Sequence, residues 1–170
     1  MSHPIHMICG LTGAGKSTFA ETLRRDIRGV RFSIDDWNAR LFFMDRQPTS
    51  DFNWFYERVQ RSCAQMRDTA EQVLQAGRPV VFDCGFTDAR ERRIFFDWAA
   101  GIGHPVTLHH VDVPKALRWQ RVVQRNAERG ATYAIEVTPE MFEFMENIWQ
   151  APDASELVGL DVDLQVHRTG

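Results

Sequence analysis

The stretch from Gly10 to Thr18 reads GLTGAGKST and fits the pattern Gly-x-x-x-x-Gly-Lys-Ser. Glycines let the backbone turn so that successive N–H groups point inward, where they can hold anionic phosphate oxygens. The helix expected from Lys16 onward adds the positive end of its dipole. Lys16 would then neutralise β- and γ-phosphate charge, and the Ser17 hydroxyl would ligate Mg²⁺. The stretch therefore predicts a phosphate-binding loop (P-loop) for ATP and Mg²⁺.

The residues around this loop agree with that interpretation. The loop residues expected to hold the nucleotide are Gly10, Thr12, Gly13, Ala14, Gly15, Lys16, Ser17 and Thr18. The apolar run Ile5–Cys9 precedes the loop and predicts a strand, and apolar residues at helical spacing follow it. Among 20 basic residues only Lys16 and Lys115 are lysines. A compact ammonium on a flexible stem reaches between phosphates where a planar guanidinium fits poorly.

Short apolar runs alternate with segments of helical periodicity along the whole chain. The runs expected as strands are Ile5–Cys9, Val30–Ile34, Val80–Phe82 and Val106–Val111, with a weaker candidate at Asp161–His167. Strands that alternate with helices imply a parallel sheet covered on both faces. No repeat, low-complexity tract or linker interrupts the pattern. We therefore expect an α/β fold of three layers and a single domain over residues 1–170.

Composition and charge limit the classes of function. The chain is 44% hydrophobic and 25% charged, as in an ordinary globular protein, and its net charge is −3. This charge gives no support to unselective nucleic-acid binding. No run of residues approaches membrane-spanning length, and the N-terminus lacks the pattern of a secretory signal. We therefore expect a cytoplasmic protein with no membrane partner.

The cysteines and histidines show no metal-ligand spacing. Cys9, Cys63 and Cys84 are odd in number, and they are expected to be small buried residues in a reducing compartment. His109 and His110 fall in a predicted strand and should point to opposite faces of the sheet. A zinc site is therefore not expected.

Two acids stand at the ends of predicted strands. Asp35 follows the second strand and Asp83 follows the third, and ligands of open α/β sheets bind outside these carboxyl ends. Asp83 after Val80–Phe82 is typical of an acid that supports the metal, so Ser17 and Asp83 are the candidate Mg²⁺ ligands. Asp35 is the better candidate for a base that accepts a proton from an attacking hydroxyl. For each acid the alternative is a helix cap or loop position, where Asp is favoured.

Four arginines share one face of a predicted helix. Arg118, Arg121, Arg125 and Arg129 recur at three- and four-residue steps before Gly130 breaks the helix. Arginines on a closing segment could bring positive charge to a transferring phosphoryl group. The pattern is equally typical of a solvated helix face with acidic partners such as Glu128.

The chain resembles the P-loop kinases related to the kinase domain of phage polynucleotide 5′-hydroxyl kinase, which also include zeta toxins and chloramphenicol phosphotransferase. The resemblance runs from the loop to about Trp149. The segments that carry it are 10–18, 33–37, Asp83 with 90–93, 111–114, 125–130 and the helix after Pro139.

The resemblance implies roles for several residues. Asp35 would be the general base, and Lys16 and Ser17 would hold phosphates and metal. Arg125 and Arg129 would act in a helical lid at about residues 125–139, with Arg125 also on the nucleotide and Arg129 the better candidate for the transferring phosphoryl. The family also implies a sheet order of 2-3-1-4-5.

One departure from the family bears on the phosphate acceptor. Polynucleotide kinases carry an arginine three residues after the catalytic Asp, to hold a nucleic-acid phosphate, but this chain has Asn38. Arg40 lies two residues farther on. Aromatic residues gather from Trp37 to Tyr56, where they could stack on an acceptor or seal a small core of their own. Asp35, Trp37, Arg40 and Asp83 are the residues expected to contact the acceptor.

These observations favour an ATP-dependent kinase that phosphorylates a hydroxyl of a small molecule. Two other functions stay open. The first is a polynucleotide or nucleoside 5′-hydroxyl kinase, with a nucleic acid as partner. The second is a nucleotide-binding regulatory module without an acceptor. Neither the acceptor nor the oligomeric state follows from the sequence.

Overall fold

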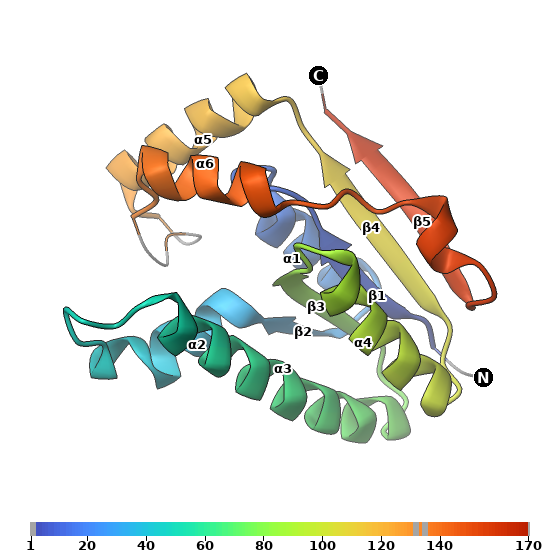
Figure 1. Ribbon diagram of the computed structural model, residues 1–170. Helices are drawn as coiled ribbons and strands as arrows, with labels where there is room; N and C mark the ends of the chain where they lie inside the picture. The colour runs from blue at the N-terminus through green and yellow to red at the C-terminus, as the bar shows by residue number, and fades with distance from the viewer. Residues whose placement is uncertain (1–2, 131–132, 134–135, 170) are drawn as a thin grey trace.

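Five strands form one parallel sheet in the order β2-β3-β1-β4-β5 (Figure 1). The computed structural model describes residues 3–130, 133 and 136–169. The strands are β1 Ile5–Cys9, β2 Val30–Ser33, β3 Val80–Gly85, β4 Val106–Asp112 and β5 Val162–Arg168. The α/β class and the strand order implied by the resemblance are both confirmed. The weak C-terminal alternation is a true strand, since β5 pairs with β4 along its whole length.

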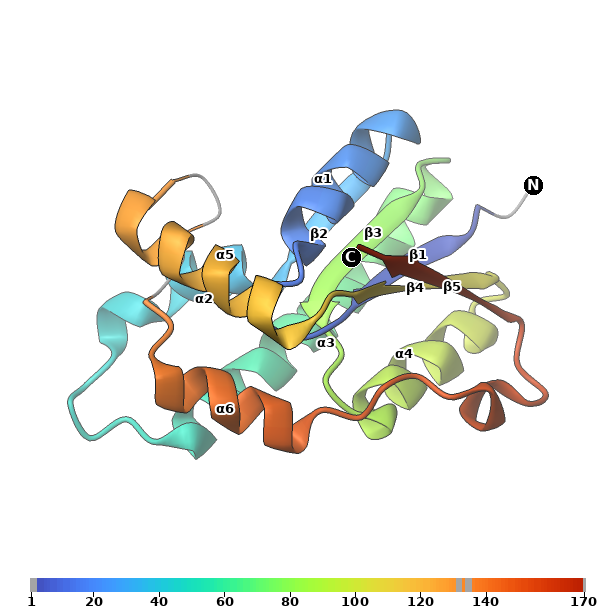
Figure 2. The same ribbon diagram turned by 90° about the horizontal axis from the view of Figure 1, so that it is seen from above.

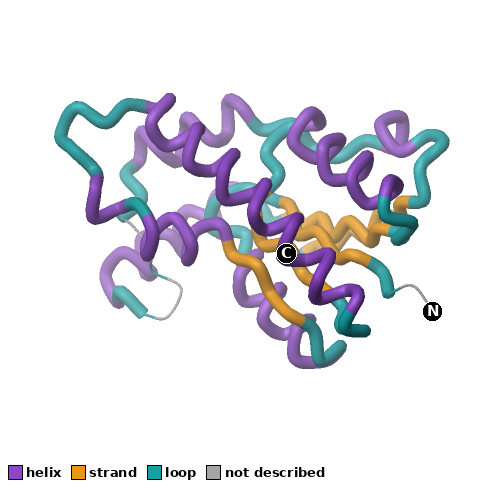
Figure 3. The backbone as a smooth tube through the Cα atoms, turned by 90° about the horizontal axis from the view of Figure 1, so that it is seen from below, coloured by secondary structure: helices purple, strands orange, loops and turns teal. Residues whose placement is uncertain are grey.

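Helices cover both faces of the sheet (Figure 2). They are α1 Lys16–Asp26, α2 Ile34–Leu41, α3 Phe52–Gln75, α4 Ala89–Gly101, α5 Lys115–Glu128 and α6 Pro139–Ile148, with short 3₁₀ turns at Phe43–Asp45 and Ala154–Leu157. Helix α1 lies on one face, and α3 and α4 lie on the other (Figure 2), so the strands run between layers of helix (Figure 3). Along β1, Ile5 and Met7 pack toward α3 and α4, while Ile8 packs toward α1. A sheet buried on both faces explains why its central strands are almost continuously apolar.

None of the helices within the described ranges combines the length and the apolar character that a membrane-spanning segment needs.

Polar side chains at the helix starts fix where the helices begin. Ser33, Asp51, Asp88 and Thr138 each accept a hydrogen bond from a backbone N–H in the first turn that follows. Because Ser33 caps α2, β2 ends one residue earlier than the sequence suggested. Asp35 therefore lies in the first turn of α2, and it is not the cap.

Three histidines form a hydrogen-bonded row on the α1 face of the sheet. His6 Nδ1 lies 3.0 Å from His109 Nε2, and His109 Nδ1 lies 3.0 Å from His167 Nε2. Burial lowers the pKa of His109 to about 3, with repulsion from the other two rings as lesser causes. His110 packs near Trp149 on the opposite face, as the strand alternation predicts. The sequence did not show the row, because its members come from three strands that only the sheet brings together.

Candidate active site

The phosphate loop depends on glycines for two physical reasons. Gly10, Gly13 and Gly15 all have positive φ values, of 146°, 81° and 95°, which L side chains rarely adopt. At Gly10 a Cβ atom would also lie 2.5 Å from the carbonyl oxygen of Val111, and at Gly13 it would collide with the carbonyl oxygen of Arg118. The loop is thus shaped by close backbone packing against β4 and α5, and its other residues follow that path into α1.

Lys16 is the first residue of α1 and lies among the acids that the sequence singled out. Its Nζ donates a hydrogen bond to the carbonyl oxygen of Leu11 at 3.1 Å. Burial lowers the pKa of Lys16, while the negative charges of Asp83 and Asp35 act in the opposite direction. Lys16, Asp35 and Asp83 are therefore within electrostatic range of one another, although they lie on three separate elements of the chain.

Asp35 combines contact with solvent and a crowded environment. Its side chain is exposed, yet its pKa is raised, chiefly by loss of hydration among surrounding protein atoms. The charge of Asp83 raises this pKa further, and the cations of Lys16 and Arg125 lower it. Asp35 thus presents an exposed carboxylate whose charge interacts with those of Lys16 and Arg125.

Asp83 has a partner that the sequence did not predict. Arg31 Nη2 donates to Asp83 Oδ2 at 2.6 Å, and Arg31 Nε donates to the same oxygen at 3.2 Å. Only 5% of the surface of Asp83 is exposed. Arg31 also lies 3.6 Å from Asp36. The only signal in the sequence was an arginine inside a short strand, and the register of β2 beside β3 is what brings it to Asp83.

The first arginine of the predicted stripe is a structural residue. Arg118 is 3% exposed and donates to the carbonyl oxygen of Val113 at 2.9 Å. Its Nη2 donates to Glu146 of α6 at 3.0 Å, and the guanidinium lies 5.3 Å from the ring centroid of Phe142. Arg118 thus fastens α6 to the start of α5.

The other three arginines differ from Arg118 and from one another. Arg121 donates to the carbonyl oxygen of Ala14 at 3.1 Å, so it holds the phosphate loop against α5. The Arg125 Nε is buried without a hydrogen-bond partner among the described residues. Arg129 ends α5 with a positive φ of 48° and is exposed. Of these three, Arg125 is the one whose charge affects both Lys16 and Asp35.

The predicted lid at 125–139 lies only partly within the described residues, since 131–132 and 134–135 are outside them. At its base, Asn126 Nδ2 donates to the carbonyl oxygen of Val137 at 2.8 Å, and the Val137 N–H donates to Asn126 Oδ1 at 3.2 Å. Val137 also packs with Val122 and Phe142. The Asn126 side chain therefore holds the start of α6 to the end of α5 through both the C=O and the N–H of Val137.

Of the α2 residues near the expected acceptor side, some are packed in the protein and one is exposed. Trp37 packs edge-on against Phe32, with 6.1 Å between ring centroids, and it belongs to the main core. Asn38 is buried and accepts a hydrogen bond from Ser62 Oγ at 3.0 Å, which ties α2 to α3. Arg40 is exposed. The position where polynucleotide kinases carry an arginine is thus a packed amide.

The aromatic segment is partly a small core of its own. Phe43 meets Phe55 edge-on at 6.1 Å between centroids, and the guanidinium of Arg58 lies 3.7 Å from the ring centroid of Trp54. Phe52 is different, because it is 59% exposed and meets Phe144 of α6 at 5.8 Å. Part of the segment therefore forms a small core of its own, as one of the two alternatives predicted, and stacking on an acceptor stays a prediction.

Comparison with known proteins identifies the family of this chain. A family described as an AAA domain matches residues 5–148, and the chain belongs to this family. No curated protein sequence matches it.

Solved structures share the fold at low sequence identity. A putative kinase from Chloroflexus aurantiacus J-10-fl is 16% identical with a TM-score of 0.72, over 98% of this chain and 85% of that one. Kti12 of Chaetomium thermophilum, in complex with ADP-AlF3, is 15% identical with a TM-score of 0.69, over 96% and 89%. The APS kinase CysC of Mycobacterium tuberculosis, in complex with AMPPNP and APS, is 16% identical with a TM-score of 0.62, over 98% and 90%. These likenesses support the P-loop kinase fold, and the finer resemblance to polynucleotide kinase stays a prediction.

Proposed function

We propose that this protein is an ATP-dependent kinase that transfers the γ-phosphoryl group to a hydroxyl of a small molecule. The observation that carries the proposal is the placement of Asp35, whose exposed carboxylate lies within electrostatic range of Lys16 in the phosphate loop. A protein that only binds a nucleotide has no hydroxyl to deprotonate, so it has no use for a base at this position.

The phosphate donor would be held by the loop and by α5. The N–H groups of the loop and the start of α1 would surround the β- and γ-phosphates. Lys16 would exchange its bond to the Leu11 carbonyl for the phosphate oxygens. Arg125, with a buried Nε that has no partner within the described part of the chain, would add positive charge where the phosphoryl group is transferred.

The residues present fit Mg²⁺, which prefers oxygen ligands. Ser17 offers a hydroxyl in the first turn of α1, and Asp83 keeps Oδ1 outside the contact that Oδ2 makes with Arg31. These two side chains would hold the ion, directly or through water. The ion would supply charge neutralisation on the β- and γ-phosphates.

Asp35 would act on the acceptor. Its carboxylate would accept the proton of the attacking hydroxyl as the new oxygen–phosphorus bond forms, and the bond between the β–γ bridging oxygen and the γ-phosphorus would break to release ADP. A carboxylate must be deprotonated to do this. Because its pKa is raised, we expect the rate to increase with pH through a value above that of an ordinary aspartate.

Two features favour a small-molecule acceptor over a nucleic acid. Asn38 is buried against Ser62, so the residue at the family's nucleic-acid phosphate position has no positive charge and faces the protein. The net charge of −3 adds no general attraction for polynucleotides. The APS kinase that shares this fold was solved with the small molecule APS, which agrees with this class of acceptor.

The decisive experiment is transfer of label from γ-labelled ATP and Mg²⁺ to a panel of hydroxyl compounds. The panel would hold sugars, nucleosides, aminoglycoside- and chloramphenicol-like compounds and 5′-hydroxyl oligonucleotides. Asp35→Asn, which cannot accept the proton, should reduce kcat by about 10²–10⁴-fold. Asp36→Asn is the matched control, because it removes the neighbouring carboxylate and should leave kcat within about threefold.

Each result has a definite meaning. Label on a small molecule, lost in Asp35→Asn and kept in Asp36→Asn, supports the proposal. Label on oligonucleotides alone would assign the second candidate function instead. ATP binding without transfer, equal in the wild type and in Asp35→Asn, would leave a regulatory nucleotide-binding module, as would equal losses in both variants.

A further inference from the structure

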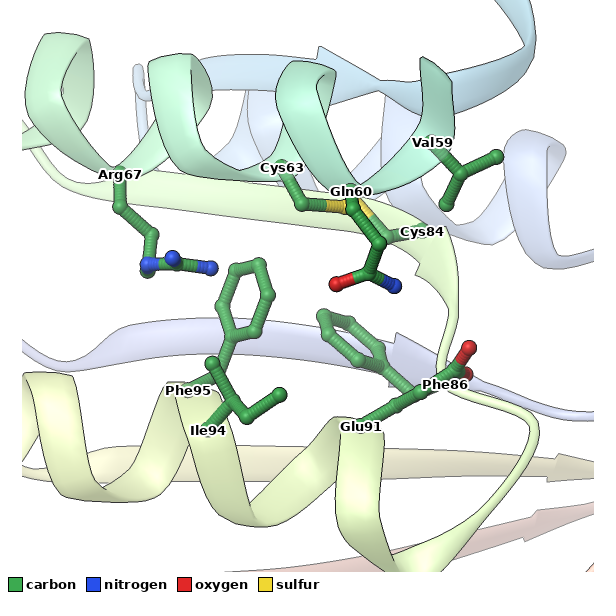
Figure 4. A pocket seen from close by; sticks show the side chains of 9 residues that line it. All are labelled: Val59, Gln60, Cys63, Arg67, Cys84, Phe86, Glu91, Ile94 and Phe95. Atoms are coloured by element: carbon green, nitrogen blue, oxygen red, sulfur yellow. The ribbon is translucent and has the colours of Figure 1, made fainter. Parts of the chain in front are cut away.

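Two cysteines that are distant in sequence meet in a narrow cleft between α3 and α4 (Figure 4). Cys63 belongs to α3, and Cys84 belongs to the carboxyl end of β3. The figure shows their sulfur atoms next to each other, at one wall of the cleft. Gln60 and Glu91 line the same cleft, which gives the thiols a polar route to solvent.

A contact between Cys84 and α3 agrees with this placement. Cys84 Sγ donates to Met66 Sδ at 3.9 Å, and Met66 lies three residues after Cys63 on the same face of α3. Cys84 therefore lies against the helix face that carries Cys63. Both thiols belong to the core between the sheet and α3, and Cys84 is the more exposed of the two. No disulfide joins them in this structure.

The surroundings of the two thiols differ. Cys63 and Arg67 are one turn apart on α3, and both line the cleft. A cation near a thiol favours the nucleophilic thiolate. Cys63 is therefore the thiol expected to react first, and Cys84 is its partner.

We propose that Cys63 and Cys84 are a redox pair that peroxide converts into an intramolecular disulfide. The Cys63 thiolate attacks one oxygen of hydrogen peroxide, which breaks the O–O bond, gives a sulfenic acid and releases hydroxide. The Cys84 thiol then attacks the Cys63 sulfur, and its proton and the sulfenic OH leave as water. Two thiols lose two electrons in total, and the peroxide gains them.

The position of the pair connects this chemistry to the predicted active site. Cys84 directly follows Asp83, whose carboxylate pairs with Arg31, and α3 begins at the exposed Phe52 near α6. A disulfide would fasten the end of β3 to α3. The proposal itself does not depend on the kinase function, because its test measures the thiols directly.

The test treats the native wild-type protein with hydrogen peroxide and maps its peptides without reduction. We expect one linked pair of peptides, containing Cys63 and Cys84, and a loss of mass equal to two hydrogen atoms. Cys9 is the internal control, because burial raises its pKa to about 12 and leaves it 0% exposed. It should stay a free thiol, and Cys9→Ser should form the same disulfide within about twofold of the wild-type rate.

Single serine variants assign the order of the steps. Cys84→Ser should accumulate a sulfenic acid on Cys63 that dimedone captures, whereas Cys63→Ser should slow oxidation of Cys84 by at least about tenfold. Three free thiols after peroxide treatment, or a disulfide only between two chains, would overturn the proposal. A sulfenic acid captured on Cys84 in preference to Cys63 would overturn the assigned order. The peptide map of the wild type decides the pairing even if a variant folds poorly.

Discussion

The two halves of α5 carry the same residue type at the same spacing, but their arginines have different surroundings. In the first half, Arg118 is buried among backbone carbonyls and Glu146, and Arg121 reaches the carbonyl of Ala14. In the second half, the Arg125 Nε has no partner among the described residues, and Arg129 is exposed. The first half packs against the phosphate loop and α6, whereas the second extends beyond them toward the predicted lid. What packs against the helix, and not its sequence pattern, therefore decides which arginines are structural.

The largest expected effect concerns Arg125. If it neutralises the transferring phosphoryl group, Arg125→Ala should reduce kcat by about 10³-fold or more, as for other arginines in this role. The free energy of unfolding should change by less than about 1 kcal/mol, because the buried Nε of Arg125 makes no hydrogen bond to the described residues. Single-turnover kinetics and urea unfolding measure the two quantities.

Arg129→Ala is the matched control for that comparison. We expect a smaller loss of kcat than in Arg125→Ala, since Arg125, and not Arg129, is among the main charges that act on Asp35 and Lys16. A larger loss in Arg129→Ala would restore the role that the family resemblance gives to Arg129.

The second effect concerns stability in the first half of α5. Arg118→Ala leaves the half-buried Glu146 without its cation. Breaking a fully buried pair costs about 3–5 kcal/mol, so we expect a loss of stability at or below the lower end of that range. Replacing both partners, as Arg118→Met with Glu146→Leu, should cost less than the single change, because no unpaired charge remains. Urea unfolding compares the variants, and equal stability of Arg118→Ala and wild type would break the proposed contrast between the two halves.

The third effect is local and lies within the second half. Asn126→Ala removes both hydrogen bonds to Val137, which should cost about 1–3 kcal/mol at the base of the predicted lid. Hydrogen exchange at the Val137 amide should become about tenfold faster or more. Asn126→Asp keeps the acceptor for that amide and should show a smaller change. Unchanged exchange in Asn126→Ala would mean that packing with Val122 and Phe142 holds the segment by itself.

The smallest effect concerns Arg121, whose support for the loop is a single hydrogen bond to Ala14. Arg121→Ala should weaken ATP binding by about fivefold, corresponding to roughly 1 kcal/mol for one such bond. Titration calorimetry measures the change, and Arg121→Lys, which keeps a donor, should recover part of it. A loss of affinity as large as that expected for a direct phosphate ligand would mean that Arg121 itself contacts the phosphates.

Much of the fold could be predicted from the sequence, because its signals are local. The alternation of apolar runs and helical periodicity predicted the α/β class, and the glycines of residues 10–15 predicted a loop whose positive φ values the structure shows. The weak alternation at the C-terminus predicted β5. The end of β2 was placed one residue too late, at Ile34. Ser33 is the last residue of β2 and also accepts a hydrogen bond from the Asp36 N–H, so α2 already begins at Ile34.

The candidate site was predictable only in part. Lys16 could be named from the loop pattern, and Asp35 and Asp83 from their places near the carboxyl ends of strands, which parallel strands bring to one edge. Asp83 was expected just after its strand, but β3 continues to Gly85 and includes it. Arg31 could not, because its pairing with Asp83 depends on the register of two strands far apart in the chain. The burial of Asn38 against Ser62 likewise depends on how α2 packs on α3.

The sequence by itself therefore determined the phosphate loop, the strand–helix alternation and the acids at the strand ends, because each follows from backbone conformation or periodicity within a few residues. Only the tertiary structure decided which arginines of α5 are buried, which partner Asp83 has, and that Cys63 and Cys84 are neighbours. These properties arise where segments distant in sequence pack together, and desolvation and pairing at such contacts are set by the neighbour and not by the residue itself.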